Sequence, residues 1–410
     1  MVEYMENKVL KPKIRFKGFT DTWEQHKFSR LANVRRGLTY SPIDISKNGV
    51  RVLRSSNIQE DKFIYSEDDV FVNKNAINID YVKNNDILIT SANGSTRLVG
   101  KHALISGLPS SSAVHGGFML LATANENPEF LNASMSSSWY SKFIELFVSG
   151  GNGAIGNLSK SDLDEQEILV PSSEEQKKLG QLFKMIDNLI TLHQSKYDKL
   201  VNVKKALLEK MFPKDGKNVP EIRFKGFTDT WEQRKFKNYF DERNERTGIG
   251  EMISVTISSG IKKFSELNRY DSKPDDLSKY KRVVEGDIAY NSMRMWQGAS
   301  GYSPYTGILS PAYTVIKPKD GISAKFFSYQ IKRPEMIHQF ELNSQGLTKD
   351  TLNLKFPAFS EIETTAPIKV NEQNKIAKLL EKVDNLITLH QHKLEKLKNM
   401  KKSLLNKMFI

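Results

Sequence analysis

The chain has 410 residues and no cysteine, and its 61 lysines and arginines exceed its 48 acidic residues, giving a formal net charge of +13. The lack of cysteine excludes disulfides and thiolate metal sites and suits a reducing compartment. The positive charge favours a polyanionic partner, with nucleic acid ahead of a membrane surface. The sequence contains neither a signal-peptide core nor an apolar run long enough to span a membrane, so we expect a cytoplasmic protein of about two or three domains.

The first predicted segment, residues 1–28, contains a motif that the chain repeats. Residues 14–28 return at residues 222–236 with a single difference, His26 against Arg234. The shared FKGFTDTW contains Lys-Gly and Thr-Asp turn signals among aromatic residues. We therefore expect a compact loop that packs against another element, once in each half of the chain.

The first insert, residues 29–172, has an α/β pattern. Apolar and β-branched runs predict strands at VRVLRSSNI, KNNDILITS, GGFMLLAT and QEILVP, and residues 128–149 predict a helix. GNGAIG (151–156) matches a dinucleotide-binding spacing, but it follows a helix instead of a strand, so we interpret it as a loop. GSTRLVGK (94–101) has one residue too many between its glycines for a phosphate loop and lacks the following Ser or Thr, which excludes that function.

Residues 173–212 predict a long helix. Apolar residues recur there at three- and four-residue steps, and the opposite face is rich in lysine. A helix of this length measures roughly 55 Å at about 1.5 Å per residue, too long to bury its apolar stripe in one small domain. We therefore expect it to pair with a second helix.

The second half of the chain repeats this plan. Residues 213–236 join the halves and carry the repeated motif, residues 237–371 form a second insert, and residues 372–410 predict a second long helix. The block DNLITLHQ is identical in the two helices, at residues 187–194 and 384–391. A duplicated frame around two different inserts indicates one architecture that carries two non-equivalent recognition heads.

The second insert is also predicted to be α/β. MISVTISS, EGDIAYNS and PAYTVIKP predict strands, and residues 323–342 predict a helical stretch. NDILITS and LSKSDL in the first insert have counterparts in GDIAYNS and LTKDTL in the second. We expect the two inserts to share one fold with diverged surfaces.

The linker between the first helix and the second repeat is short. About nine residues precede the second motif, and they span at most about 30 Å, less than the length of the helix. The second repeat therefore starts near the far end of the first helix and its own helix runs back, which gives an antiparallel pair with one head at each end. We predict that the helix-pair interface contains Leu182, Ile186, Leu189, His193, Tyr197, Leu200, Leu379, Val383, Leu386, His390, Leu394 and Leu397.

No catalytic motif is recognisable. The histidines form no HExxH pattern, no NPPY- or DPPY-like tetrapeptide of adenine methyltransferases occurs, and Pro274-Asp275 lacks the Glu-x-Lys that would complete a nuclease set. We interpret His193 and His390 as histidines of a helix seam instead of metal ligands. We therefore expect no catalytic residue and no metal site in this chain.

Candidate DNA-binding residues are basic and amide side chains that alternate with aromatic residues in loops. Arginine suits guanine, asparagine and glutamine suit adenine, threonine or tryptophan suits a thymine methyl or a sugar edge, and lysines after a helix-capping residue suit phosphate. In the first insert we select Arg54, Asn57, Asn93, Thr96, Arg97, His115 and Lys160. In the second we select Lys262, Lys263, Arg294, Trp296, Gln297 and Lys349. The competing interpretation of each residue is solvated surface charge.

The repeated motifs resemble those of the specificity (S) subunits of type I restriction–modification enzymes. RFKGFTDTWEQ is similar to the repeated lead-in of these subunits, and EEQKKLGQLFKMIDNLITLHQ and NEQNKIAKLLEKVDNLITLHQ are similar to their two conserved regions. LSKSDL and LTKDTL are similar to the ends of their target-recognition domains. The resemblance extends over nearly the whole chain in the same order.

This resemblance implies a non-catalytic reader of double-stranded DNA. It implies an α/β fold with two similar target-recognition domains, joined by an antiparallel coiled coil of two helices with pseudo-two-fold symmetry. Each domain would read one half of a bipartite, asymmetric site, and the coiled coil would set the spacer. Two methyltransferase (M) subunits with S-adenosylmethionine and two restriction (R) subunits with ATP and magnesium would supply the chemistry, so this chain would bind no cofactor.

Two other interpretations stay open at this point. The chain could be an autonomous nuclease or methyltransferase, against which the missing motifs argue. It could also be a coiled-coil scaffold that contacts only proteins and whose charge is incidental. Activity assays on the isolated chain would detect the first, and binding to random duplexes at low and moderate salt would distinguish the second from a DNA reader.

Overall fold

The computed structural model describes residues 11–148, 156–214, 216–257, 260–267 and 276–410. The chain divides into two compact units, Met1–Gln194 with His392–Ile410, and Ser195–Gln391. The boundary between them lies within both long helices, α5 (Ser173–Lys210) and α9 (Val370–Met408). Each unit therefore contains one head, part of α5 and part of α9.

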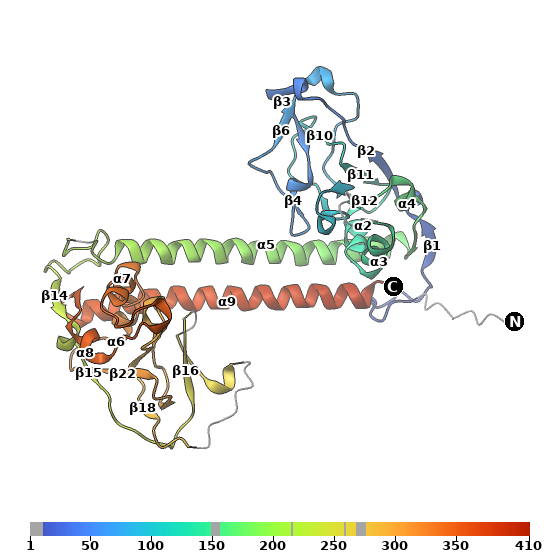
Figure 1. Cartoon of the computed structure of the whole chain (residues 1–410). Helices are drawn as coiled ribbons and strands as arrows, with labels where there is room; N and C mark the ends of the chain where they lie inside the picture. The colour runs from blue at the N-terminus through green and yellow to red at the C-terminus, as the bar shows by residue number, and fades with distance from the viewer. Residues whose placement is uncertain (1–10, 149–155, 215, 258–259, 268–275) are drawn as a thin grey trace. The chain divides into compact units, whose positions relative to one another are not determined.

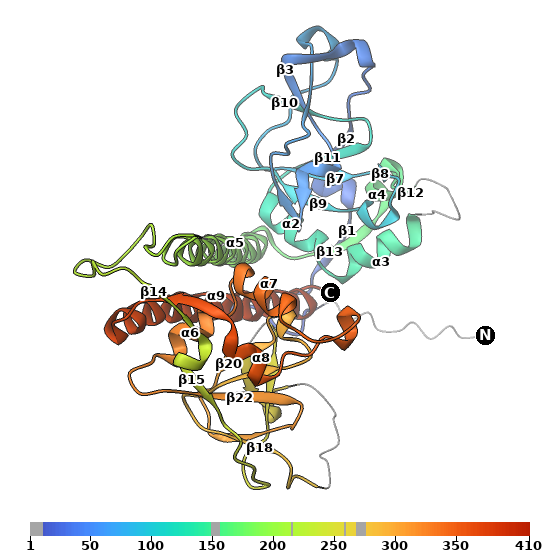
Figure 2. The same ribbon diagram turned by 60° about the vertical axis from the view of Figure 1, so that its left-hand side comes forward.

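The head of the first unit is built on two small sheets (Figure 1). The larger sheet is antiparallel and contains β2 (Ala32–Arg36), β11 (Met119–Ala124), β7 (Asp86–Thr90) and β9 (His102–Leu104), in that order (Figure 2). All of β7 is buried, as expected for a strand that is covered on both faces. In the smaller sheet, β3 (Ile45–Leu53) lies between the parallel β10 (Ala113–His115) and the antiparallel β6 (Val70–Val72).

The second head repeats the larger sheet. Its four antiparallel strands are β15 (Phe240–Glu242), β22 (Tyr313–Pro318), β19 (Ile288–Asn291) and β20 (Ser300–Tyr302), in that order (Figure 2). Two strand pairs accompany it, β16 (Ile253–Thr256) with β17 (Gly260–Lys263) and β18 (Lys281–Val283) with β21 (Gly307–Leu309). The equivalent order of strands confirms that one fold is used twice.

The helical stretch predicted in each head is divided into two helices. The described part of the first stretch, residues 128–148, contains α2 (Pro128–Met135) and α3 (Ser138–Phe147), separated at Ser137, whose hydroxyl donates to the carbonyl of Ser134 at 2.7 Å. Such local bonds compete with the helical hydrogen bonds. In the second head, α6 (Ala324–Gln330) and α7 (Pro334–Leu342) are separated before Pro334, which cannot donate a helical hydrogen bond.

The repeated motif and the start of each long helix form a frame around each head. In the first unit, β1 (Glu24–Lys27) pairs with β13 (Glu167–Val170), and in the second, β14 (Glu232–Lys235) pairs with β23 (Glu363–Ala366). The remaining short elements are α1 (Phe28–Leu31), α4 (Lys160–Glu165), α8 (Phe356–Glu361), β4 (Ile58–Gln59), β5 (Lys62–Phe63), β8 (Ala92–Asn93) and β12 (Gly156–Asn157). GNGAIG lies outside the described residues except for Gly156, which belongs to β12.

Each frame also contacts the last turn of a long helix. The amide of Ile14 donates to the carbonyl of Lys407 at 2.9 Å, and the amide of Ile222 donates to that of Lys210 at 2.9 Å. The ring of Trp23 lies 6.1 Å from that of Phe409, and the ring of Trp231 lies 6.0 Å from that of Phe212. The end of α9 therefore packs on the first repeated motif as the end of α5 packs on the second.

The two helices run antiparallel within each unit. In the first unit Phe183 of α5 lies against Phe409 with ring centroids 5.6 Å apart. Asp187, one turn after Phe183, pairs at 2.6 Å with Lys401 of α9, which precedes Phe409 by about two turns. In the second unit Lys204 pairs with Asp384 at 2.6 Å, and the last turn of α5 shares a buried cluster with Ile376 near the start of α9. The antiparallel pairing predicted from the linker is confirmed.

The predicted apolar stripe is correct only in part. Ile186, Val383 and Leu394 are buried, and Leu182, His193, Tyr197, Leu200, Leu379, His390 and Leu397 are half-buried. Leu189 and Leu386 were predicted wrongly, because 38% and 44% of these side chains are exposed. Each repeated block places leucine next to isoleucine, and Ile190, not Leu189, faces the core of its unit.

No helix within the described residues is long and apolar enough to cross a membrane.

Candidate nucleic-acid interface

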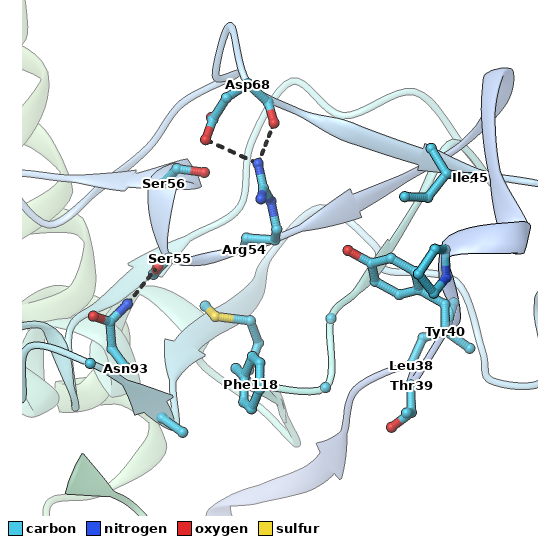
Figure 3. Close-up of a pocket in the computed structure, with 16 residues that line it drawn as sticks. Leu38, Thr39, Tyr40, Ile45, Arg54, Ser55, Ser56, Asp68, Asn93 and Phe118 are labelled. Atoms are coloured by element: carbon cyan, nitrogen blue, oxygen red, sulfur yellow. Dashed lines mark hydrogen bonds and ion pairs between the residues drawn. The ribbon is translucent and has the colours of Figure 1, made fainter. Parts of the chain in front are cut away.

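The first head contains a cavity of about 690 Å³, which we call the head-1 pocket. Five segments meet there, namely the loops that follow β2, β3, β7 and β10 and the segment before β6 that contains Asp68, and their side chains point toward a common space (Figure 3). The lining residues are Leu38, Thr39, Tyr40, Pro42, Ile45, Arg54, Ser55, Ser56, Asp68, Ala92, Asn93, Gly94, Gly116, Gly117, Phe118 and Met119. The structure thus brings the predicted DNA contacts Arg54 and Asn93 together from segments far apart in the sequence.

Arg54 follows the last residue of β3, and its backbone is fixed by a buried amide. Its N–H donates to Oδ1 of Asn57 at 2.7 Å, and Asn57 donates in turn to Asp69 at 2.7 Å and to the carbonyl of Ile64 at 3.1 Å. The guanidinium extends into the head-1 pocket, where Nη2 lies 3.0 Å from Oδ2 of Asp68 and also donates to the Asp68 carbonyl (Figure 3). A hydrogen bond from the Ser66 hydroxyl lowers the pKa of Asp68 and keeps its carboxyl ionised.

Asn93 and Phe118 form another side of the head-1 pocket. Nδ2 of Asn93 donates to Oγ of Ser55 at 3.1 Å, and its Oδ1 accepts from the backbone of Ser95 at 2.9 Å. Phe118 follows two glycines and is 71% exposed. An exposed phenyl ring beside amide, hydroxyl and guanidinium groups suits the edges of bases in the major groove, where the thymine methyl is apolar and the other exposed groups form hydrogen bonds.

Two of the predicted contacts are buried. Asn57 has no exposed surface and holds the Arg54 turn, as described above. His115 also has no exposed surface, and its Nε2 lies 3.3 Å from the carbonyl of Arg35. Burial lowers the pKa of His115 to about 4, so the ring is neutral at neutral pH. Neither side chain is accessible to DNA in this structure, because both are buried in the head although they lie next to loops in the sequence.

The other predicted contacts of the first head lie outside the head-1 pocket. Thr96 and Arg97 are exposed on a short 3₁₀ turn that follows β8, the strand that carries Asn93. Lys160 starts α4 and forms an ion pair with Asp164 one turn later. Its predicted phosphate contact therefore requires exchange of that partner.

In the second head, the segment that follows β19 contains three of the predicted contacts. Arg294 is exposed after β19, and the next 3₁₀ turn, Met295–Gln297, contains Trp296 and Gln297, which are half-buried. Nε1 of Trp296 donates to the carbonyl of Met293 at 3.1 Å, and Nζ of Lys349 lies 5.5 Å from the centroid of the Trp296 ring. Trp296 and Lys349 are thus in contact, and Lys349 also pairs with Glu341 at 3.2 Å, while the exposed Arg294 precedes Trp296 by two residues.

Lys262 and Lys263 belong to a different part of the second head. Both are on β17, where Lys262 lies 3.9 Å from Glu266 and Lys263 lies 2.9 Å from Glu251. The hydrogen bond to Glu251 raises the pKa of Lys263. Because each lysine already has an acidic neighbour, these two contribute less net positive charge than their sequence indicates.

The loops after β7 and β19 occupy equivalent places in the two heads. The amide of Leu158 donates to the carbonyl of Ser91 at 2.7 Å, and that of Leu354 donates to the carbonyl of Ser292 at 2.8 Å. Asn93 lies two residues after Ser91, and Arg294 lies two residues after Ser292, so these two residues occupy equivalent positions. Both residues are among the contacts predicted from the sequence, whereas Phe118 and Asp68 are not. The sequence signal for Phe118 was a phenylalanine that directly follows two glycines. Nothing in the sequence indicated that Asp68 would contact Arg54.

Comparisons with known proteins agree with this arrangement. A family model described as type I restriction modification DNA specificity domain matches residues 20–202 and again residues 228–399. Two specificity subunits of Methanocaldococcus jannaschii type I restriction enzymes are similar to the chain. The putative MjaX subunit is 23% identical over 78% of this chain and 76% of its own length, and the MjaVIII subunit is 25% identical over 79% and 78%. The crystal structure of a type I restriction–modification S subunit from M. genitalium matches the fold with a TM-score of 0.63, at 14% identity, over 98% of this chain and 99% of that one.

Proposed function

The chain belongs to the type I restriction–modification DNA specificity family. We propose that it is a DNA-recognition subunit in which each head reads one half of a bipartite, asymmetric site. The observation that carries this proposal is the contrast between matching frames and different heads. The two frames repeat their contacts, whereas equivalent loops carry Asn93 in one head and Arg294 in the other. Two readers of one fold with different side chains recognise different base sequences, so the complete site is not a palindrome.

Each head has a surface that supports base recognition. In the first, the head-1 pocket offers Arg54 and Asn93 beside the exposed ring of Phe118. In the second, the exposed Arg294 lies beside Trp296 and Lys349. The net charge of +13 supplies attraction to the phosphate backbone, and it makes binding weaken steeply as salt rises. The long helices that each head is attached to would set the unread spacer between the half-sites.

The chemistry belongs to partner subunits in this proposal. Among the described residues no group of three or more acidic, histidine or cysteine side chains is placed to hold a metal ion. The relatives named above are specificity subunits, and this chain would likewise act through two methyltransferase subunits and two restriction subunits in the cytoplasm. S-adenosylmethionine would be bound by the methyltransferase subunits, and ATP and magnesium by the restriction subunits.

Two equivalent helix surfaces are available for the methyltransferase subunits. The repeated DNLITLHQ block exposes Leu189 and Leu192 on α5, and Leu386 and Leu389 on α9, with exposed fractions between 38% and 47%. Apolar side chains that are exposed at the same places of a repeat form two like patches, and like patches bind two copies of one partner. An amphipathic helix of the partner is the element that fits a helical row of leucines.

The function is tested by expressing the chain with and without its methyltransferase partner and mapping methylated adenines in the host DNA. We expect methylation at one split sequence only when both are present, and no methylation or cleavage by the chain alone. Modification by the isolated chain would instead establish an autonomous enzyme. If the S–M complex bound no duplex even at low salt, the protein-only scaffold would be the better description.

The docking surface is tested by introducing charge into one or both leucine patches. Leu189→Asp should remove one methyltransferase subunit from the complex, and Leu189→Asp with Leu386→Asp should remove both, as measured by native mass spectrometry. Thr191→Asp and Thr388→Asp are matched controls, because these threonines are exposed on other faces of the same turns. An unchanged subunit count in the double leucine variant would show that the partner docks elsewhere.

A further inference from the structure

The head-1 pocket holds one cation and one anion, and they are paired with each other. Among its lining residues only Arg54 and Asp68 carry a charge, and Nη2 of Arg54 lies 3.0 Å from Oδ2 of Asp68 (Figure 3). The pair makes the pocket close to neutral. A phosphate would meet the Asp68 carboxylate there, and two like charges repel. The neutral pocket therefore suits the edge of a base and not the DNA backbone.

The contact with Asp68 determines which part of Arg54 can reach a base. Both contacts with Asp68, through its carboxylate and through its carbonyl, use Nη2. Nε is buried without a hydrogen-bond partner in the structure, whereas Nη1 makes no described contact with Asp68. Nη1, with two N–H donors, is therefore the part of the guanidinium that can serve a ligand.

Arg54 is also fixed at its other end. Its backbone amide donates to the buried Asn57, and Asp68 is held by the hydroxyl of Ser66. An arginine side chain that is free in solution loses much rotamer entropy when it binds, and one that is held before binding loses less. The geometry therefore presents a pre-oriented donor group at the mouth of the pocket.

We propose that Asp68 is a specificity-determining residue of the first head, which positions Arg54 so that the N–H groups of its Nη1 meet a guanine in the major groove. Guanine presents two acceptors there, O6 and N7, whereas adenine presents one acceptor and one donor. The exposed ring of Phe118 lies on the opposite side of the pocket as an apolar surface for the neighbouring base or sugar (Figure 3). Asp68 acts through Arg54 and is a positioning residue, and the inference rests on the proposed function of the first head.

The experiment uses the complete S–M complex and a set of duplexes in which every base pair of both mapped half-sites is substituted in turn. Binding is measured by fluorescence anisotropy. Arg54→Ala and Asp68→Ala should each reduce the preference for G·C by about tenfold or more at the same single base pair, because one such arginine contact contributes discrimination of this order. The other half-site, which the second head reads, should keep its full preference and thereby report that the complex is folded.

Three further variants separate positioning from charge. Asp68→Asn keeps an oxygen acceptor for Nη2 and should retain an intermediate preference. Glu67→Gln removes one negative charge from the neighbouring exposed residue and should leave every base preference unchanged. Asp68→Ala added to Arg54→Ala should have no further effect, since Asp68 acts only through that side chain.

The inference is overturned if Asp68→Ala changes no base preference, changes one at a different base pair from Arg54→Ala, broadens both half-sites equally, or adds to the effect of Arg54→Ala. A wild-type complex with no base preference in either half-site would refute the proposed function itself. That outcome is separate, because it is measured before any variant is made.

Discussion

The two frames of this protein keep the same contacts, and the two heads they carry do not. Arg15 forms a bidentate pair with Glu175 through Nε and Nη2, both at 2.7 Å, and Arg223 forms the same pair with Glu372 at 2.6 and 2.8 Å. By contrast, the loop after β7 has Asn93 at the position where the loop after β19 has Arg294. The constant part of the chain makes the same contacts in both units, whereas the variable part differs, as the proposed reading of two unlike half-sites requires.

The attachment of each head to its long helix shows an intermediate case. In the first unit Glu129 of α2 pairs with Lys184 of α5 at 2.9 Å, and in the second Lys325 of α6 pairs with Glu381 of α9 at 2.6 Å. The contact is kept while its polarity is reversed. Both junctions therefore require an ion pair at this place, whereas the sign of the charge on the head side differs between the two heads.

The largest effect is expected from removing an arginine of the frame. Glu175 and Glu372 are 1% and 2% exposed, so Arg15→Met or Arg223→Met leaves a buried carboxylate without its partner. Such changes cost about 3–5 kcal/mol. The free energy of unfolding, measured with urea, should fall by this amount in the unit concerned, whereas Lys205→Ala, which breaks an exposed pair with Glu209, should change it by less than about 0.5 kcal/mol.

The same two variants also distinguish the frames. Nε1 of Trp231 lies 3.4 Å from Glu372, whereas Nε1 of Trp23 is buried without a partner. Glu372 therefore keeps one donor after Arg223 is removed, and Glu175 loses both of its arginine bonds. We expect Arg15→Met to be more destabilising than Arg223→Met by about 1 kcal/mol, the typical contribution of one hydrogen bond. Equal effects would mean that the tryptophan contact contributes nothing.

A smaller, pH-dependent effect should separate the heads. His115 of β10 is buried with a pKa lowered to about 4, whereas the equivalent position of β21 is the buried Leu309. The unfolded chain binds a proton at His115 near the ordinary pKa of about 6.5, and the folded head does not. Stability contributed by the neutral ring is therefore complete above that value and is lost as the pH falls from about 6.5 toward 4.

His115→Leu gives the first head the residue of the second and tests this difference. The wild-type first head should lose up to about 3 kcal/mol between pH 7 and pH 4 from this group, and the variant should not. Thermal unfolding at several pH values measures the difference between the two proteins, so that acid effects common to both cancel. A variant with the same pH dependence as the wild type would show that the imidazole is protonated within the fold.

Much of this architecture was predictable from the sequence because it rests on repetition and periodicity. The two inserts, the long helices and their antiparallel direction followed from the duplicated motifs and the length of the linker. Gly180, the one glycine in the first long helix, remained unexplained by that pattern. In the structure a Cβ at this position would lie 2.7 Å from the backbone nitrogen of Phe130, so α2 can approach α5 only where no side chain intervenes.

The candidate site was less predictable, because contacts between distant segments have no local signature. Arg54 and Asn93 were selected for the bases that their side chains suit, and they do line one pocket. Asn57 was selected for the same reason and is buried, since an amide serves equally well to hold a turn. Leu189 was assigned to the helix interface because adjacent apolar residues satisfy the same periodicity, and only packing determines which of them is covered.

The smallest effect is expected at the reversed ion pair, where it tests whether position or charge attaches the head. Glu129→Lys places two lysines opposite each other in the first unit and should destabilise it by roughly 0.5–1 kcal/mol, since both side chains are partly exposed. Glu129→Lys with Lys184→Glu recreates the polarity of the second unit and should restore the original stability, measured in a double-mutant cycle of thermal unfolding. If the double variant remained as unstable as the single one, the polarity would be fixed by the surroundings of each head, and exchanging heads between frames would require those surroundings to be exchanged as well.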